Sequence, residues 1–334
     1  MQRIQSRRQV LAVIAAGIVG LSAAGNAAAQ ARDKLRLVMP TPATTYQLPW
    51  LVAQDTGWFK ERGLDVEEIY VGGDSTALRT VLSGSGDITL VGPPTVFHAV
   101  SEGARIKYIG ASQPVVDYNI LGAKSATDLA SLADKTFASA GPADLTTEIP
   151  RLVMRKNGIN TDKVKFLQVG GHAARLQALE VGKVQGAMVN TLTMLIGQKN
   201  GQIKVLANVA KDFPQLGYVM YTAQTSALND PAKRKAFDTF MGGNIYGARL
   251  IMSDPAKAAA VLSKRAPDLP ADLVAAVIKQ LNSDKVWGVD GGIDAQMVSF
   301  TSDSMVQWKM IDRGVKAADI IDDRFVKAGL AMVK

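Results

Sequence analysis

Apolar and polar positions along the chain form short apolar runs separated by amphipathic stretches, a pattern that predicts alternating strands and helices. The stretch Val71–Thr95 shows this pattern in full. Its glycine pair and hydroxyl-bearing residues precede a helical apolar stripe from Ala77 to Leu82, which ends at Gly84. Asp87–Val91 is then a run typical of a buried parallel strand. Both loops of this stretch follow the carboxyl ends of predicted strands, where open α/β sheets bind their ligands.

The same pattern returns ninety-eight positions later in the sequence. Val71–Gly73 corresponds to Val169–Gly171, and Asp74 corresponds to His172. Order and spacing agree over about a hundred residues, which favours an internal repeat over an accidental likeness of two βαβ units. The repeat predicts two similar α/β halves whose loop edges face each other.

The first residues have the features of a secretory signal peptide. Arginines including Arg7-Arg8 precede an apolar run, Val10–Leu21, that is too short to span a bilayer, and small residues follow it. We expect cleavage after Ala31, or after Ala29 as the alternative, and a periplasmic mature protein. The arginine pair resembles a twin-arginine export signal, while Sec export and a retained anchor stay open.

The remaining elements are expected in the following order. Leu35–Met39 and Arg105–Ser112 alternate like strands, and Gln113–Asn119 is expected to cross from the first half to the second. Phe213–Gly217 is expected to form the return crossing. Helical patterns dominate from Asn229 onward, and we expect these helices to support the first half.

Three segments carry a resemblance to a known family: LVAQDTGWFKERGLDVE, GGDSTALRTVLSGSGDITLVGPPT and SEGARIKYIG. They resemble periplasmic substrate-binding proteins of the nitrate/sulfonate/taurine and thiamine-precursor group, the SsuA-like proteins, which serve ABC importers. The Gly57-Trp58-Phe59 segment with Gly63-Leu64, and the Gly86-Asp87 turn, carry the resemblance most firmly. It covers nearly the whole mature chain, through loose patterns that contain no catalytic fingerprint.

The resemblance implies a two-lobed α/β fold, the type II periplasmic binding protein. Each lobe would be a mostly parallel sheet flanked by helices, with two hinge crossings and the ligand enclosed between the lobes. A small-molecule ligand and the membrane permease of an ABC importer are the implied partners of a monomeric protein. The expected divisions are 1–31 for the signal peptide, 32–115 for the first part of lobe 1, 116–215 for lobe 2, and 216–334 for the return to lobe 1 and the C-terminal helices.

Composition narrows the function classes. The three arginines of the signal account for part of the net charge of +8, which leaves +5 on scattered residues of the mature chain. We therefore expect a solvated surface and no nucleic-acid partner. The chain has no cysteine, which excludes disulfides, thiolate metal sites and cysteine nucleophiles. The pyrimidine synthase of the thiamine-precursor branch carries a cysteine-rich segment, which this chain lacks.

Catalytic chemistry finds little support in the sequence. No nucleophile elbow, phosphate loop or metal-ligand cluster is present, so we expect neither an enzyme nor a cofactor or metal. Of the two histidines, His98 is expected to pack on an apolar helix. His172 stands at a predicted helix start and is the better candidate for hydrogen bonding to a ligand.

The candidate ligand contacts lie in the loops that follow predicted strands. Hydroxyls and free backbone N–H groups at helix starts are donors for a polar ligand. Asp144 is expected to cap the helix that follows it. The predicted ligand-binding residues are Thr41, Thr44, Tyr46, Gly73, Ser75, Pro94, Thr95, Gln113, Gly141, Leu145, Thr146, His172 and Asn190.

The same loops bear on the charge of the ligand. They contain no Lys or Arg, so a multivalent anion would lack a bidentate partner. An organic monoanion, a sulfonate or carboxylate with an aromatic tail, could be held by helix N-termini and hydroxyls. A neutral heteroaromatic such as a pyrimidine is the alternative, and binding of amines alone would instead promote Asp74 and Asp144. A sensor or chemoreceptor as the partner, in place of an importer, also stays open.

Overall fold

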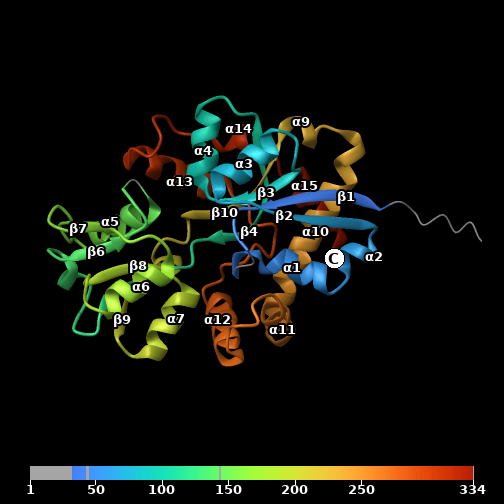
Figure 1. The fold of residues 1–334 in the computed structure, drawn as a ribbon. Helices are drawn as coiled ribbons and strands as arrows, with labels where there is room; N and C mark the ends of the chain where they lie inside the picture. The colour runs from blue at the N-terminus through green and yellow to red at the C-terminus, as the bar shows by residue number, and fades with distance from the viewer. Residues whose placement is uncertain (1–31, 43–44, 143, 334) are drawn as a thin grey trace, which may run out of the picture. The chain divides into compact units, whose positions relative to one another are not determined.

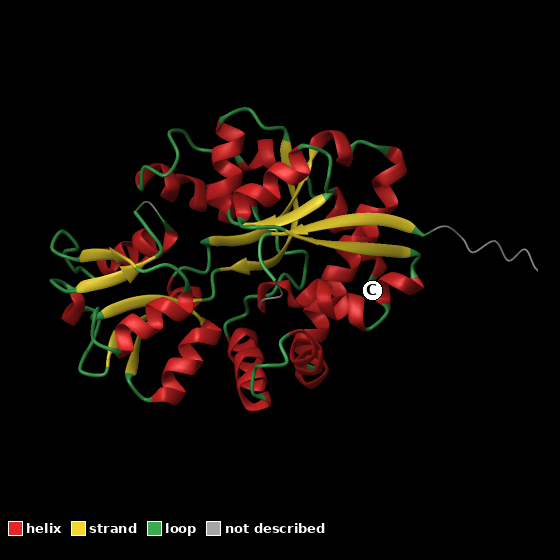
Figure 2. Cartoon of the chain, viewed as in Figure 1, coloured by secondary structure: helices red, strands yellow, loops and turns green. Residues whose placement is uncertain are grey.

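The computed structural model of the protein describes residues 32–42, 45–142 and 144–333. The chain divides into the units Met1–Arg32 and Asp33–Lys334, and the predicted signal peptide lies outside the described residues. The unit that begins at Asp33 contains two five-stranded sheets, each with helices packed against it (Figures 1 and 2).

The first sheet consists of β2 (Leu64–Tyr70), β1 (Asp33–Met39), β3 (Ile88–Val91), β10 (Gly217–Gln224) and β4 (Ile106–Val115), in this order. β1 runs parallel to both β2 and β3. β10 is antiparallel to its neighbours β3 and β4. A strand from late in the chain therefore separates two strands from its beginning.

The second sheet consists of β7 (Lys165–Gln168), β6 (Thr136–Ser139), β8 (Gly186–Asn190), β5 (Tyr118–Ala123) and β9 (Ile203–Asn208), in this order. β6 runs parallel to β7 and β8, whereas β5 is antiparallel to β8 and β9. The two sheets thus share one topology, in which the fourth strand alone is antiparallel. The predicted fold class, two α/β lobes with mostly parallel sheets, is confirmed.

The predicted repeat extends to the helices. α3 (Asp74–Leu82) and α6 (His172–Glu180) are each nine residues long and start ninety-eight positions apart. α4 (Pro93–Ser101) and α7 (Thr191–Asn200) also start ninety-eight positions apart, and each follows the third strand of its sheet. Matching order, length and spacing make the two halves structural repeats of one βαβα unit.

Strand periodicity explains why each sheet has two hydrophobic faces. Successive side chains of a strand point to opposite faces, so Leu37 and Met39 of β1 join one core cluster, while Val38 joins another. The same alternation divides β8, where Met188 and Val189 belong to different clusters. Each sheet therefore requires helices on both faces to remove its apolar surface from water.

Helices from both ends of the chain bury these faces. The larger cluster of the first sheet is built with α1 (Leu48–Asp55), α2 (Trp58–Glu61), α9 (Thr225–Leu228), α10 (Pro231–Ser253), α11 (Pro255–Arg265), α12 (Ala271–Ser283) and α15 (Arg324–Met332). Its other face is covered by α3, α4, α13 (Ala295–Gln307) and α14 (Ala317–Ile320). The second sheet packs against α5 (Leu145–Lys156) and α8 (Val209–Asp212) on one face and against α6 and α7 on the other. Two short 3-10 helices complete the elements, η1 (Thr45–Gln47) and η2 (Ala130–Leu132).

The first crossing is shorter than the sequence indicated. Gln113 pairs with Val219 and Val115 pairs with Gly217, so antiparallel pairing with β10 extends β4 beyond Ser112. β5 already begins at Tyr118, so both ends of the predicted crossing Gln113–Asn119 belong to strands. The connection is reduced to Val116 and Asp117. The return connection runs from Phe213 to Leu216, between α8 and β10.

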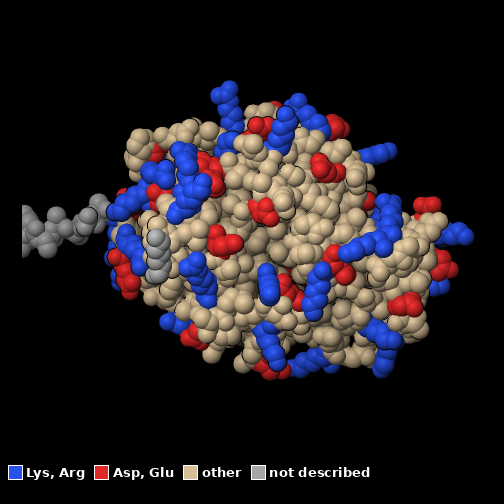
Figure 3. All heavy atoms as spheres, turned by 180° about the vertical axis from the view of Figure 1, so that it is seen from behind, with Lys and Arg blue, Asp and Glu red and all other residues tan. Residues whose placement is uncertain are grey.

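Lysine and arginine side chains are dispersed over the molecular face drawn in Figure 3. Acidic side chains lie between them on this face, as expected of a solvated surface. Across the described ranges, no helix combines the length and the hydropathy that crossing a membrane would require.

Close packing between α1 and α10 provides a test of the larger core. A Cβ atom at Gly247 would lie 1.8 Å from the carbonyl oxygen of Pro49, a backbone atom that cannot rotate away. We expect Gly247→Ala to lower the free energy of unfolding by at least about 2 kcal/mol, because overpacking forces the two helices apart. Denaturant unfolding measures the effect. Gly72→Ala is the matched control, since its Cβ would meet nothing within 4 Å. Equal stabilities for the two variants would contradict this packing.

Candidate functional site

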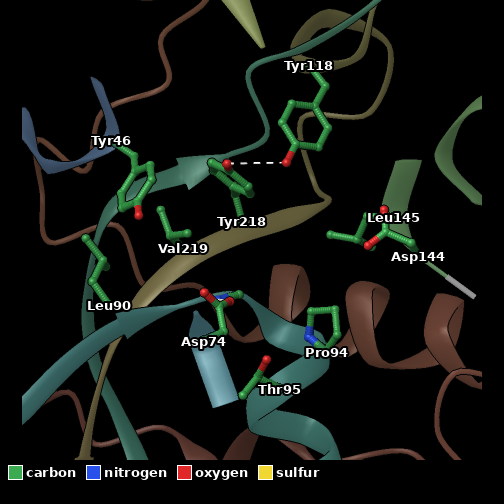
Figure 4. Close-up of a pocket in the computed structure, with 11 residues that line it drawn as sticks. Tyr46, Asp74, Leu90, Pro94, Thr95, Tyr118, Asp144, Leu145, Tyr218 and Val219 are labelled. Atoms are coloured by element: carbon green, nitrogen blue, oxygen red, sulfur yellow. Dashed lines mark hydrogen bonds between the residues drawn. The ribbon is translucent and has the colours of Figure 1, made fainter. Parts of the chain in front are cut away.

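A cavity of about 280 Å³ lies where loops and strand ends of both sheets meet (Figure 4). It is bounded by elements of the first sheet and by Tyr118, Asp144 and Leu145 from the second half. Most of the lining residues follow or begin strands at the edge where α/β sheets bind ligands. The full lining is Tyr46, Asp74, Leu90, Gly92, Pro94, Thr95, Tyr118, Asp144, Leu145, Tyr218 and Val219.

Three phenol rings form a continuous aromatic row along the cavity. Tyr46 and Tyr218 meet edge to face with 6.3 Å between ring centroids, and Tyr218 and Tyr118 do so at 5.4 Å. The row continues to the imidazole of His172, whose centroid lies 5.4 Å from that of Tyr118. Tyr118 opens β5 and Tyr218 lies at the start of β10, so the row joins the two crossing strands (Figure 4).

Tyr46 is held in place by polar contacts at both ends. Its carbonyl oxygen accepts a hydrogen bond of 2.7 Å from the Ser112 hydroxyl of β4. Its phenol oxygen lies 3.0 Å from the hydroxyl of Thr41. The predicted residue Thr41 therefore orients a cavity residue without lining the cavity itself.

Asp74, the first residue of α3, connects two loops of the first half. Its Oδ2 accepts a hydrogen bond of 3.0 Å from the backbone N–H of Gly92, at the start of α4. Burial raises the pKa of Asp74, and the hydrogen bond from Gly92 offsets this effect in part. The carboxylate thus fixes the spacing between the loops and faces the cavity at the same time.

His172 occupies the equivalent position in the second half and makes the equivalent bond. Its Nδ1 accepts a hydrogen bond of 3.1 Å from the backbone N–H of Asn190 and lies 2.9 Å from the guanidinium of Arg175. Burial lowers the pKa of His172 to about 3, and the charge of Arg175 adds to the shift. The imidazole is therefore neutral, with its proton on Nε2.

Asp144 caps α5 as the sequence predicted. Its Oδ1 accepts a hydrogen bond of 2.8 Å from the backbone N–H of Thr146 and another of 2.5 Å from the Thr146 hydroxyl. Asp144 also lines the cavity, although the sequence favoured a structural role for it as a helix cap. One side chain thus has both roles.

The structure brings only some of the predicted ligand-binding residues to the cavity. Tyr46, Pro94, Thr95 and Leu145 line it. Thr44 lies outside the described residues. Those placed elsewhere than the lining are Thr41, Gly73, Ser75, Gln113, Gly141, Thr146, His172 and Asn190.

Three of these residues have internal partners instead. Gln113 is fully buried in β4, where its Nε2 donates to the Val115 carbonyl at 3.3 Å. The Thr146 hydroxyl donates to Asp144, and the Asn190 side chain caps α7 by accepting from the N–H of Thr193.

The sequence predicted that His98 packs on an apolar helix, and this was wrong. His98 is exposed beside Glu102, because it lies on the outer face of α4.

Tyr118 and Tyr218 are the main lining residues that sequence reasoning missed. Both lie at the start of the strand that arrives from the other half, a position the repeat of βαβα units does not include. The available signal was a tyrosine at the end of each predicted crossing, one inside Gln113–Asn119 and one directly after Phe213–Gly217, a hundred positions apart. Only strand pairing shows that these two positions converge.

Asp117 anchors the first crossing to the second half. Its backbone carbonyl accepts from the Thr191 hydroxyl at 3.0 Å and from the Asn119 amide at 3.3 Å. Its carboxylate accepts a 3.4 Å bond from the Thr191 N–H. Burial raises the pKa of Asp117 to about 6, partly offset by hydrogen bonds and reinforced slightly by the charge of Asp284.

This buried carboxyl predicts a pH dependence of stability. The pKa of Asp117 is higher in the folded protein than in the unfolded chain, so the folded protein binds this proton more tightly. The free energy of unfolding therefore falls as the pH rises between about 4 and 6. We expect Asp117→Asn to be more stable than wild type by about 3 kcal/mol at pH 8, with the difference shrinking as pH falls and vanishing below the unfolded pKa of 3.8. Denaturant unfolding at several pH values measures this. A constant difference across that range would contradict the assignment.

Comparison with known proteins shows the family of the chain and a distant relative of it. A family model described as "NMT1/THI5 like" matches residues 44–258. YtlA of Bacillus subtilis (strain 168), a presumed binding protein by its name, is 25% identical over 188 residues. That match covers 55% of this chain, and the chain spans only 56% of the length of YtlA.

Solved structures share the fold at low sequence identity. The periplasmic aliphatic sulphonate-binding protein SsuA of Escherichia coli superposes with a TM-score of 0.68 at 16% identity, covering 87% of this chain and 92% of SsuA. The periplasmic nitrate-binding protein NrtA of Synechocystis PCC 6803 gives 0.70 at 13% identity, covering 91% and 89%. A ligand-binding component of an ABC-type import system from Staphylococcus aureus gives 0.71 at 13% identity, covering 89% and 98%.

Proposed function

This chain is a member of the NMT1/THI5-like family, and we propose that it is the solute-binding component of an ABC importer. One solved protein that shares its fold is named as the ligand-binding component of an ABC-type import system, and two others are named as periplasmic sulphonate- and nitrate-binding proteins.

The cavity is the observation that carries this proposal. Tyr46 and Asp74 approach it from the first half, and Tyr118 and Asp144 approach it from the second. A ligand held there contacts both halves, and it stabilises arrangements in which both sets of contacts form together. Ligand binding then shifts an equilibrium between open and closed forms, and the closed form docks on the permease.

We divide the chain into lobes at the two crossings. Residues 32–115 and 216–334 form lobe 1, and residues 116–215 form lobe 2. The antiparallel strands β5 and β10 support this division, because each joins a sheet directly after a crossing. The short connection at Val116 and Asp117 and the longer one from Phe213 to Leu216 would act as hinges.

The lining supports binding rather than catalysis. Its hydroxyl groups belong to one threonine and three tyrosines, and the nearby His172 has its Nδ1 engaged by Asn190 and Arg175. A histidine that acts as general base for a nucleophile needs its acceptor nitrogen free and within hydrogen-bond reach of the hydroxyl that it activates. The histidine here organises a loop instead.

The proposed role requires export. Arg7-Arg8 and the apolar run Val10–Leu21 support delivery to the periplasm by a twin-arginine-like signal peptide cleaved near Ala31. There the mature protein would act as a monomer that carries its ligand to the membrane permease.

The aromatic row gives a direct test of the binding role. We expect a screen of sulfonates, aromatic carboxylates, pyrimidines and organic amines to identify compounds that raise the melting temperature of the mature protein. Tyr218→Ala should weaken binding of every such compound by at least about tenfold in calorimetric titration, because the central ring of the row is lost.

Tyr246→Ala is the matched control for this experiment. Tyr246 stacks on Trp58 in the lobe 1 core, with 5.9 Å between ring centroids, and does not line the cavity. Its loss should lower stability without lowering affinity. Ligands that bind Tyr218→Ala as tightly as wild type would reject this cavity as the binding site.

A further inference from the structure

The cavity has an acidic, aromatic lining. Two of its eleven described residues are the carboxylates Asp74 and Asp144, three are tyrosines, and none is a lysine, arginine or histidine. Figure 4 shows the two carboxylates on opposite sides of the space, with Tyr218 above it and Pro94 below. The charges of the lining therefore favour a ligand of positive charge.

Helix N-termini on the lobe 1 side offer few donors to an anion. α4 begins at Pro93 and Pro94, which have no backbone N–H. The N–H of Gly92, directly before them, already donates to Asp74. The N-terminus of α3 carries Asp74 itself in its first turn, which places a negative group where an anion would bind.

On the lobe 2 side, several N–H groups at the starts of α5 and α7 are engaged by internal partners. The N–H of Thr146 donates to Asp144 at the start of α5. At the start of α7, the N–H groups of Asn190 and Thr191 donate to His172 and Asp117, respectively. Several of the donors that would suit an organic monoanion are thus already used within the protein.

Arg175 is a buried basic group close to this side of the site, but its guanidinium forms hydrogen bonds within the protein. It donates to the carbonyl oxygens of Met188 and Gly170 and lies 2.9 Å from Nδ1 of His172. Arg175 does not line the cavity. Its guanidinium thus ties together strand β8, the glycine loop before α6 and the imidazole of His172. The cavity is left without a basic lining group.

The two carboxylates, in contrast, retain capacity for a ligand. Each has one oxygen engaged, Oδ2 of Asp74 by Gly92 and Oδ1 of Asp144 by Thr146. Among the described residues, their second oxygens have no hydrogen-bond partner, and neither side chain forms an ion pair within 4.0 Å. Burial raises the pKa of Asp74, as expected of a carboxylate without a cationic partner.

A metal ion does not explain this pair of carboxylates. In the described ranges, no three or more acidic or histidine side chains gather as a metal site would require. Ca²⁺ needs six or more oxygen ligands, and the aromatic rings around the two carboxylates supply none of that kind. Rings of tyrosine beside carboxylates instead match an organic cation, which they attract through the negative faces of their π systems.

We propose that the ligand is a small organic cation, whose charged nitrogen lies between Asp74 and Asp144 and whose carbon groups contact the rings of Tyr46, Tyr118 and Tyr218. This inference rests on the proposed solute-binding function. It replaces the organic monoanion that the sequence favoured, because the lining carries two carboxylates and no basic side chain, and several of the donors assumed for that anion are engaged within the protein.

The test compares ligands that differ in charge but little in shape. The probes are phenethylammonium, phenethyl alcohol and phenylpropionate, together with choline and its uncharged carbon isostere dimethylbutanol. Binding to the mature protein is measured by calorimetric titration at neutral pH and low salt. We expect the two cations to bind at least about tenfold more tightly than their uncharged or anionic counterparts.

Two variants neutralise the carboxylates while keeping their structural bonds. In Asp74→Asn the amide oxygen can still accept from Gly92, and in Asp144→Asn the side chain can still cap α5, since asparagine caps as well as aspartate. Each should weaken cation binding by at least about tenfold. Asp294→Asn is the matched control, an exposed N-cap of α13 away from the cavity, and should bind like wild type.

The outcomes separate this inference from the proposed function. Preferential binding of an uncharged or anionic probe, lost in Tyr218→Ala, would overturn the cation assignment and leave the solute-binding role intact. Cation binding that survives both aspartate substitutions would also overturn it. Absence of Tyr218-dependent binding by probes of every charge class, in this series and in the broader screen, would count against the solute-binding function itself.

Discussion

The architecture depends on one constraint: each sheet is completed by a strand that arrives from the other half of the chain. β5 enters the second sheet directly after leaving the first, and β10 returns to lie between β3 and β4. Both are antiparallel to their neighbours, so each begins at the edge where the parallel strands end. This geometry places Tyr118 and Tyr218 at a shared cavity and links the two halves through only two short connections.

A second repeated interaction organises the rim of each half. The first residue of α3 and the first residue of α6 each accept a hydrogen bond from the backbone N–H that opens the next helix, eighteen residues later. The bond occupies the same position in both halves, but its acceptor differs: it is the carboxylate of Asp74 in the first half and the neutral imidazole of His172 in the second. The same architectural bond therefore uses a carboxylate that lines the cavity in the first half and a neutral imidazole outside the lining in the second half.

Much of the molecule could be predicted from the sequence because local patterns dictate it. The βαβα repeat followed from glycine placement and apolar spacing, and α3 and α6 start at the two residues that the repeat had aligned. Capping of α5 by Asp144 was also readable, because a cap depends only on the next few residues. The crossing predicted at Gln113–Asn119 was too long for the opposite reason. Its first residues belong to β4 because they pair with β10, which lies about a hundred residues away in the chain.

By itself, the sequence determined the order of strands and helices, the internal duplication and the resemblance to binding proteins, because each depends on spacing along the chain. Only the tertiary structure decided which side chains share the cavity. Insertion of β10 between β3 and β4 brought Tyr218 to Tyr46 and Tyr118. Packing also engaged N–H groups at the starts of α4 and α7 with internal acceptors. The electrostatic character of the cavity depends on those long-range pairings, since they decide which donors are consumed and which carboxylate oxygens remain free.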